Sequence, residues 1–199
     1  MGTDRYLTIP NMLTYLRMGL IPVFVVLFFL PFPYQREILT GLFIIAGLTD
    51  LLDGILARRL KQFTRFGAFL DPVADKLMVA TALVLLVYDY HNILMTIAGV
   101  VIVLREITIS ALREWMAQVG KHAAVKVSIL GKVKTVIQFV AICVLLSQPA
   151  GMSWVTVSGF ILIYVAVAMT LWSMFWYLEA AYKVLKQQPV GGDTTQEQK

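Results

Sequence analysis

Long apolar stretches recur along nearly the whole chain, and they constrain its fold more than any other feature. A helix needs about 20 residues to cross the roughly 30 Å hydrocarbon core of a bilayer. Six stretches are candidates for such helices: Leu13 to Leu30, Ile38 to Leu56, Phe69 to Val87, Ile93 to Leu112, Val133 to Leu146 and Val155 to Tyr177. The composition agrees, because 59% of the 199 residues are hydrophobic and only 15% are charged. The bilayer is therefore the expected solvent of most of the chain.

The pattern within these stretches favours helices over a membrane β-barrel. Barrel strands need only about ten residues of alternating polarity, whereas these stretches are continuously apolar. We expect an all-α membrane protein, a bundle of six transmembrane helices in a single domain covering residues 1–186. The first stretch is expected to be retained rather than cleaved as a signal peptide, because it is long and contains Arg17 and Pro22. Residues 187–199 are polar and are expected to form a disordered tail.

The placement of basic residues predicts the orientation of the bundle. Short loops rich in Lys and Arg stay on the cytoplasmic side of a membrane. Such residues cluster between the second and third stretches and again between the fourth and fifth: Arg58, Arg59, Lys61, Arg65, Lys121, Lys126, Lys132 and Lys134. The turns at 89–92 and 148–152 carry no Lys or Arg. Both termini are therefore expected in the cytoplasm. The single cysteine, Cys143, excludes an intrachain disulfide.

Four aspartates lie inside or beside two of the apolar stretches, where charge is most expensive. On a helix turning about 100° per residue, Asp50 and Asp53 share an arc of roughly 140° with Gly54, Ala57 and Arg58. On the next helix, three residues spaced by four cover an arc of about 80°: Gly67, Asp71 and Asp75. The two helices are expected to be antiparallel neighbours, so all four carboxylates converge near the cytoplasmic membrane surface.

The cost of burying these carboxylates points to divalent cations. An Asp at the centre of a membrane helix costs roughly 2.5 to 3.5 kcal/mol, so four unpaired ones would cost about 10 to 14 kcal/mol. Hard ions such as Mg²⁺ or Mn²⁺ prefer carboxylate oxygens, and the absence of Cys and His from this segment makes zinc a poor candidate. Two other interpretations stay open: ion pairs with Arg58, Arg59 and Arg65, or a proton or cation pathway of a transporter.

The spacing of these residues resembles a known family pattern. The chain reads Asp50, two residues, Asp53 and Gly54, two residues, Ala57 and Arg58, eight residues, Gly67, three residues, Asp71, three residues, Asp75. This pattern is similar to that of the CDP-alcohol phosphatidyltransferases, and all eight positions match. Members of that family are membrane enzymes that move a phosphatidyl group from CDP-diacylglycerol to an alcohol and release CMP.

The resemblance implies roles for individual residues. Two divalent ions, Mg²⁺ or Mn²⁺, would be held by the carboxylates of Asp50, Asp53, Asp71 and Asp75. Asp75 would also act as the catalytic base. The CDP group would lie across Asp50, Asp53 and Asp71, beside the small residues Gly54, Ala57 and Gly67, with Arg58 assisting its phosphate. Direct attack and a phosphatidyl-enzyme intermediate both remain open.

Two further stretches bear on the acceptor alcohol. "IPNMLTYLR" from Ile9, and "REITISALREWMAQVGK" from Arg105 with the later "GKVKT" from Gly131, resemble the bacterial phosphatidylglycerophosphate synthases within that family. The resemblance implies sn-glycerol 3-phosphate as the acceptor. Its phosphate would be bound by the basic residues Arg105, Arg113, Lys132 and Lys134, with Thr14 and Arg17 on the acceptor side. Glu106 and Glu114 would orient these cations.

Alternatives to this acceptor site stay open at this stage. Each basic residue also suits a cytoplasmic anchor that binds anionic lipid headgroups. Another acceptor alcohol, or a non-enzymatic cation transporter or lipid-binding bundle, would give a similar composition. The family resemblance further implies a homodimer in the bacterial cytoplasmic (inner) membrane, in contact with membrane lipid, with its active site facing the cytoplasm. No nucleic-acid partner is expected.

Overall fold

Six helices account for the regular structure of the described chain. The structure is a computed structural model that describes residues 9–60, 65–118 and 129–187. The helices are α1 (Ile9–Phe29), α2 (Gln35–Leu60), α3 (Arg65–Tyr90), α4 (Ile93–Gln118), α5 (Ile129–Ser147) and α6 (Trp154–Gln187). Each predicted apolar stretch lies within one of them, apart from Leu30, which follows the end of α1. The predicted all-α fold with six helices is confirmed. Most of the predicted tail, residues 188–199, lies outside the described residues.

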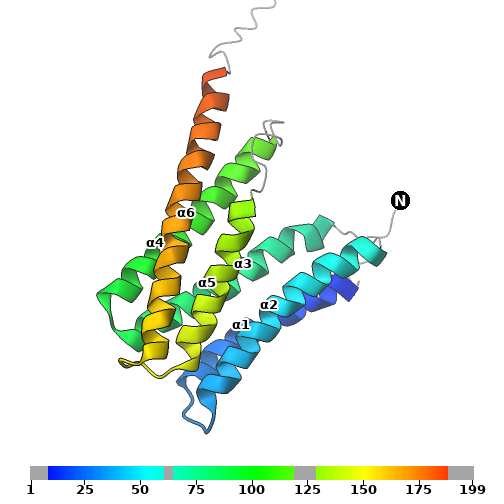
Figure 1. The fold of residues 1–199 in the computed structure, drawn as a ribbon. Helices are drawn as coiled ribbons and strands as arrows, with labels where there is room; N and C mark the ends of the chain where they lie inside the picture. The colour runs from blue at the N-terminus through cyan, green and yellow to red at the C-terminus, as the bar shows by residue number, and fades with distance from the viewer. Residues whose placement is uncertain (1–8, 61–64, 119–128, 188–199) are drawn as a thin grey trace, which may run out of the picture.

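Short connections join the helices in pairs at one end of the bundle. Residues 30–34 connect α1 to α2, residues 91–92 connect α3 to α4, and residues 148–153 connect α5 to α6 (Figure 1). We call this the hairpin end. In the bundle, α1 packs against α2 and α3, α5 lies against α2 and α6, and α4 contacts α3 and α6. This connectivity brings α2 and α3, which carry the four aspartates, into contact with each other.

Local capping explains where two of the helices begin. The Oδ1 atom of Asn92 accepts a hydrogen bond from the backbone N–H of Leu94 at 2.8 Å, just before α4. The hydroxyl of Ser153 accepts one from the backbone N–H of Thr156 at 3.0 Å, just before α6. Asn and Ser are favoured at helix starts because their side chains satisfy amides that lack an intrahelical partner. The hairpin end is therefore specified by the residues next to its turns.

The apolar interior depends on close approach of neighbouring helices at two glycines. A Cβ atom on Gly47 of α2 would lie 2.4 Å from Cε2 of Phe139 on α5. A Cβ atom on Gly159 of α6 would lie 2.7 Å from Cδ2 of Leu145 on α5. Small residues allow membrane helices to approach each other closely. Both glycines face side chains of α5, so α5 packs tightly between α2 and α6.

The outer surface of the bundle is apolar, as a lipid-facing surface would be. Large hydrophobic side chains are more than half exposed on several helices, including Val84, Val136 and Phe175. Three helical segments among the described residues are long and apolar enough to cross a membrane: Asn11–Phe29, Ile93–Met116 and Trp154–Glu179. A shorter apolar segment covers Val133–Ser147 in α5. The chain is thus a helical protein with three candidate membrane-spanning segments among its described residues, consistent with the predicted membrane location.

Candidate active site

The charged side chains of the predicted site lie in the half of the bundle away from the hairpin end. We call this part the charged half and define it by Arg17, Asp50, Asp75, Arg105, Glu106 and Lys134. They come from five helices, α1 to α5. Arg17, Arg105 and Lys134 are almost completely buried, which is unusual for cations and requires partners within the fold.

Two of the four predicted aspartates have described side chains, and they interact. Nη1 of Arg17 on α1 donates to Oδ1 of Asp50 on α2 at 2.7 Å. The Arg17 side chain is 1% exposed, whereas that of Asp50 is 41% exposed. Asp75 on α3 is close enough for the two carboxylates to repel each other, and Arg17 attracts both. Arg17 was predicted on the acceptor side; the structure places it against the aspartates.

The remaining residues of the aspartate pattern lie on the same two helices. The backbone of α2 includes Asp53, Gly54, Ala57 and Arg58, and the backbone of α3 includes Gly67 and Asp71. Their side chains lie outside the described part of the structure, as does that of Lys132 on α5. Among the described side chains there is no group of three or more acidic, His or Cys residues suited to a metal ion. The carboxylates of Asp50 and Asp75 nonetheless lie on adjoining helices and repel each other. Carboxylate oxygens are the ligands that Mg²⁺ and Mn²⁺ prefer.

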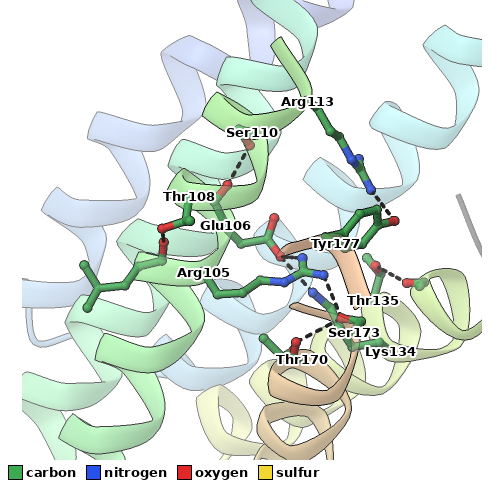
Figure 2. A network of polar contacts seen from close by, with 12 residues as sticks. Arg105, Glu106, Thr108, Ser110, Arg113, Lys134, Thr135, Thr170, Ser173 and Tyr177 are labelled. Atoms are coloured by element: carbon green, nitrogen blue, oxygen red, sulfur yellow. Dashed lines mark hydrogen bonds and ion pairs between the residues drawn. The ribbon is translucent and has the colours of Figure 1, made fainter. Parts of the chain in front are cut away.

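A second cluster joins α4, α5 and α6 through one carboxylate. Oε1 of Glu106 accepts from Nη1 of Arg105 at 3.0 Å and from Nζ of Lys134 at 2.8 Å. Nη2 of Arg105 donates to the hydroxyl of Ser173 on α6 at 2.8 Å, and that hydroxyl donates to the carbonyl oxygen of Thr170 (Figure 2). The structure therefore brings Arg105 and Lys134 together, with Glu106 orienting both. Two cations share one carboxylate, so the cluster keeps a net positive charge.

Arg113 does not join this cluster. Its Nη2 atom donates to the hydroxyl of Tyr177 on α6 at 2.9 Å, and its guanidinium lies 5.1 Å from the centre of the Tyr177 ring. Figure 2 shows this pair apart from Glu106. Glu114 is exposed, and Thr14 is buried in α1. Of the residues predicted at the acceptor site, Arg105, Lys134 and Glu106 are thus in direct contact.

One cavity is lined both by Asp75 and by Glu106, the carboxylate of the second cluster. It has a volume of about 250 Å³, and it lies between α3, α4 and α5. Its charged and polar lining comes from Asp75, Lys76, Glu106, Thr135 and Gln138, and the rest of its wall is apolar. A cavity of this size is smaller than the pockets that hold drug-sized ligands, so it suits a small polar molecule.

Sequence reasoning missed three polar residues of this region. On α6, Ser173 accepts a hydrogen bond from Arg105 and Tyr177 accepts one from Arg113. On α5, Gln138 lines the cavity. The spacing of Gln138 could have revealed it, because it follows Lys134 by one helical turn within an otherwise apolar stretch. The position of Tyr177 at the end of the sixth apolar stretch carries no indication of a partner on α4.

Comparisons with known proteins bear on this geometry. The family model described as CDP-alcohol phosphatidyltransferase matches residues 7–172. A protein of Salmonella paratyphi A named CDP-diacylglycerol--glycerol-3-phosphate 3-phosphatidyltransferase is 53% identical over 173 residues, 87% of this chain and 94% of the relative. A protein of the same name from Yersinia pestis is 50% identical over 90% of this chain and 97% of the relative. The resemblance inferred from the aspartate spacing is confirmed: the chain belongs to the CDP-alcohol phosphatidyltransferase family.

Proposed function

We propose that this enzyme transfers the phosphatidyl group of CDP-diacylglycerol to sn-glycerol 3-phosphate, giving phosphatidylglycerophosphate and CMP. The names of relatives at 50% identity or more support both substrates. The observation that carries the proposal is the cavity between α3, α4 and α5. Asp75 lines one wall, and Glu106, which holds two cations, lines another. A small phosphorylated alcohol needs both a base and a cationic pocket.

The donor site is proposed at the aspartates of α2 and α3. Asp50, Asp53, Asp71 and Asp75 would hold two divalent ions, Mg²⁺ or Mn²⁺. When bound, such ions neutralise the diphosphate and stabilise the negative charge that develops on the leaving phosphate. Around them, the cytidine would lie beside Gly54, Ala57 and Gly67, where larger side chains would intrude, and Arg58 would contact the phosphate. Arg17 supports this site by fixing the Asp50 carboxylate.

The acceptor phosphate is proposed to bind Arg105 and Lys134. Both side chains are buried and already oriented by Glu106, so little conformational entropy is lost when an anion arrives. Arg suits phosphate through its paired donors, and Lys supplies a compact charge. The acceptor side is also proposed to include Thr14, Arg17, Lys132 and Arg113. Of the two arginines on α4, Arg113 lies eight residues beyond Arg105.

The chemical step follows from the position of Asp75. Its carboxylate would take the proton from the 1-hydroxyl of sn-glycerol 3-phosphate. The resulting oxygen attacks the phosphorus that carries the diacylglycerol. A new phosphorus–oxygen bond forms, the bond from that phosphorus to the bridging oxygen of the diphosphate breaks, and CMP leaves with the electron pair. The chain's own contribution would be to hold the proposed base, Asp75, and Glu106, the carboxylate that orients the two cations, on two walls of one cavity.

The membrane placement is proposed from the fold and the distribution of charge. All six helices would span the cytoplasmic membrane of a bacterium as a homodimer, with both termini and the charged half toward the cytoplasm. The three apolar segments and the exposed hydrophobic surface support a membrane location. A site at the lipid boundary lets the acyl chains stay in the bilayer, which avoids about 0.8 kcal/mol for each CH₂ transferred to water.

The test is an acceptor panel. The purified protein is incubated with CDP-diacylglycerol, Mg²⁺ and one alcohol at a time: sn-glycerol 3-phosphate, glycerol, inositol or serine. We expect CMP release that depends on sn-glycerol 3-phosphate and stops when a chelator removes the divalent ion. Release with a different alcohol alone would identify another acceptor. Metal-dependent ion flux in vesicles without any CMP would show a transporter instead.

A further inference from the structure

A buried glutamine on α5 is left without a role by the steps above. Gln138 is 5% exposed, and its Oε1 atom is buried with no hydrogen-bond partner among the described residues. Buried polar groups in folded proteins are nearly always hydrogen-bonded, because an unpaired one costs free energy comparable to a lost hydrogen bond. The partner of this oxygen must therefore come from outside the described residues, as a water or a bound molecule would.

Gln138 lines the same cavity as the proposed base, Asp75, and as Glu106, the carboxylate that binds Arg105 and Lys134. Three neighbouring helices supply the charged and polar residues of its wall: Asp75 and Lys76 from α3, Glu106 from α4, and Thr135 and Gln138 from α5. Gln138 follows Lys134 by four residues, so the two side chains lie on one face of α5 about one turn apart. The Gln138 side chain thus lines the cavity about one turn from Lys134, although its Oε1 atom itself is buried.

Among the neutral polar residues of the cavity lining, Gln138 is the one with a buried polar atom that lacks a partner in the described part of the chain. The remaining neutral polar residue of the lining, Thr135, already donates its hydroxyl to the carbonyl oxygen of Gly131 at 2.9 Å. Much of the remaining wall consists of apolar side chains, including Leu83, Ile102 and Ile142. Gln138 can therefore supply a hydrogen bond to a neutral hydroxyl of a bound molecule.

We propose that Gln138 is a specificity-determining residue whose amide hydrogen-bonds the 2-hydroxyl of the acceptor alcohol. This rests on the proposed function. The acceptor has three polar groups in sequence: the 1-hydroxyl that faces Asp75, the 2-hydroxyl, and the phosphate that faces Arg105 and Lys134. The 2-hydroxyl lies between the other two and needs its own partner. A hydroxyl both donates and accepts, and rotation of the amide presents either its oxygen or its NH₂ group.

The decisive experiment compares two acceptors that differ by one hydroxyl. 3-Hydroxypropyl phosphate keeps the primary hydroxyl and the phosphate of sn-glycerol 3-phosphate and lacks only the 2-hydroxyl. A site built to bond a hydroxyl rejects the analogue without it, so the wild type should prefer sn-glycerol 3-phosphate by roughly tenfold to hundredfold in kcat/KM. In Gln138→Met, which keeps the length of the side chain but not the amide, this preference should fall to about threefold or less.

A matched control and a second readout complete the design. Gln148→Met makes the same replacement at the hairpin end and should keep the wild-type preference. Without ligand, Gln138→Met should unfold thermally at or above the wild-type midpoint, since it removes an unpaired buried oxygen. The wild-type midpoint should rise more with sn-glycerol 3-phosphate than with 3-hydroxypropyl phosphate, and in Gln138→Met the two rises should be equal.

Two failures are distinguishable. If the wild type releases no CMP with either acceptor, the proposed function fails and the role of Gln138 falls with it. If the wild type transfers to sn-glycerol 3-phosphate and Gln138→Met keeps the full preference, only the role of Gln138 is refuted. Should the variant be inactive, an undiminished difference between its two ligand-induced midpoint rises refutes the role equally.

Discussion

The two halves of the bundle both contain arginine–carboxylate pairs, but the pairs are built differently. Near the hairpin end, Arg36 of α2 binds both carboxylate oxygens of Asp89 on α3, at 2.6 and 2.8 Å. Each charge has one dedicated partner. In the charged half, the single carboxylate of Glu106 forms ion pairs with both Arg105 and Lys134. A closed one-to-one pair stabilises the fold, whereas a shared carboxylate leaves positive charge for an anion to neutralise.

The cavities of the two halves also differ in the charge of the residues that line them. The cavity at the hairpin end is the larger of the two, with a volume of about 680 Å³, and every residue that lines it is uncharged. The cavity of the charged half is about 250 Å³ and is lined by Asp75, Lys76 and Glu106 among others. The comparison teaches that size and ion pairing alone do not identify the reactive site of this protein. What distinguishes the smaller cavity is its charged lining, which includes the carboxylate of Asp75 and the Glu106 carboxylate that two cations share.

Replacing one aspartate in each half should give the largest contrast. Asp75→Asn removes the proposed base, and proton transfer by a positioned group contributes about 10²- to 10⁴-fold to a rate. We expect CMP release to fall by at least that lower factor while nucleotide binding stays measurable. Asp89→Asn, which breaks the Arg36 pair, should keep the wild-type kcat/KM. Normal turnover by Asp75→Asn would show that another group accepts the proton.

The cationic cluster predicts the next largest effect. Lys134→Met leaves the Arg105–Glu106 pair in place and removes one of the two proposed phosphate contacts. A hydrogen bond to a charged group contributes about 1.5–3 kcal/mol, so kcat/KM for sn-glycerol 3-phosphate should fall roughly 10- to 150-fold. Lys186→Met, at an exposed position near the end of α6, is the control. A rise in the KM for CDP-diacylglycerol with an unchanged KM for the acceptor would show that Lys134 belongs to the donor site.

The sequence predicted the helices and the central chemistry because both depend on local periodicity. Continuous apolar runs place six helices, and residues spaced by three or four share a face, which is how Asp50 and Asp75 were placed toward a common site. Glu106 was likewise predicted beside the cations, and it contacts Arg105 and Lys134. Periodicity within each helix shows which residues share a face, whereas the roles of these residues and their meeting across helices came from the family resemblance and from the predicted order of the helices.

Contacts between distant helices could not be derived in this way. Arg105 and Arg113 are about 80° apart around α4, but eight residues also separate them by about 12 Å along the axis. That displacement allows Arg113 to pair with Tyr177, while Arg105 reaches Ser173. The Arg17–Asp50 pair likewise depends on how α1 packs on α2, and neither helix specifies that packing by its own pattern.

Helix packing beside the cavity gives a smaller predicted effect. In Gly47→Ala the new methyl would meet the ring of Phe139, which stacks on Phe43 with centroids 5.0 Å apart and therefore cannot move freely. Overpacking of this kind costs about 1–3 kcal/mol, so the midpoint of thermal unfolding in detergent should fall by several degrees. Because Phe139 also lines the cavity, activity should fall too. Gly41→Ala, on the same helix with nothing within 4 Å of its added Cβ, should match the wild type in both measurements.

The smallest effect is expected at the hairpin end, from Arg36→Met. The Arg36 and Asp89 side chains are 23% and 14% exposed, so their pair is partly screened and should contribute about 1 kcal/mol to stability. The unfolding midpoint should drop by a few degrees, and the double variant Arg36→Met/Asp89→Asn should recover part of that loss, since no unpaired carboxylate is then left. In Arg36→Met, in Asp89→Asn and in the double variant, kcat/KM should stay at the wild-type value, because this pair only holds α2 to α3 near the hairpin end. A loss of activity larger than the loss of folded protein would mean that the two halves are coupled through these helices, and the hairpin end would then belong to the functional machinery.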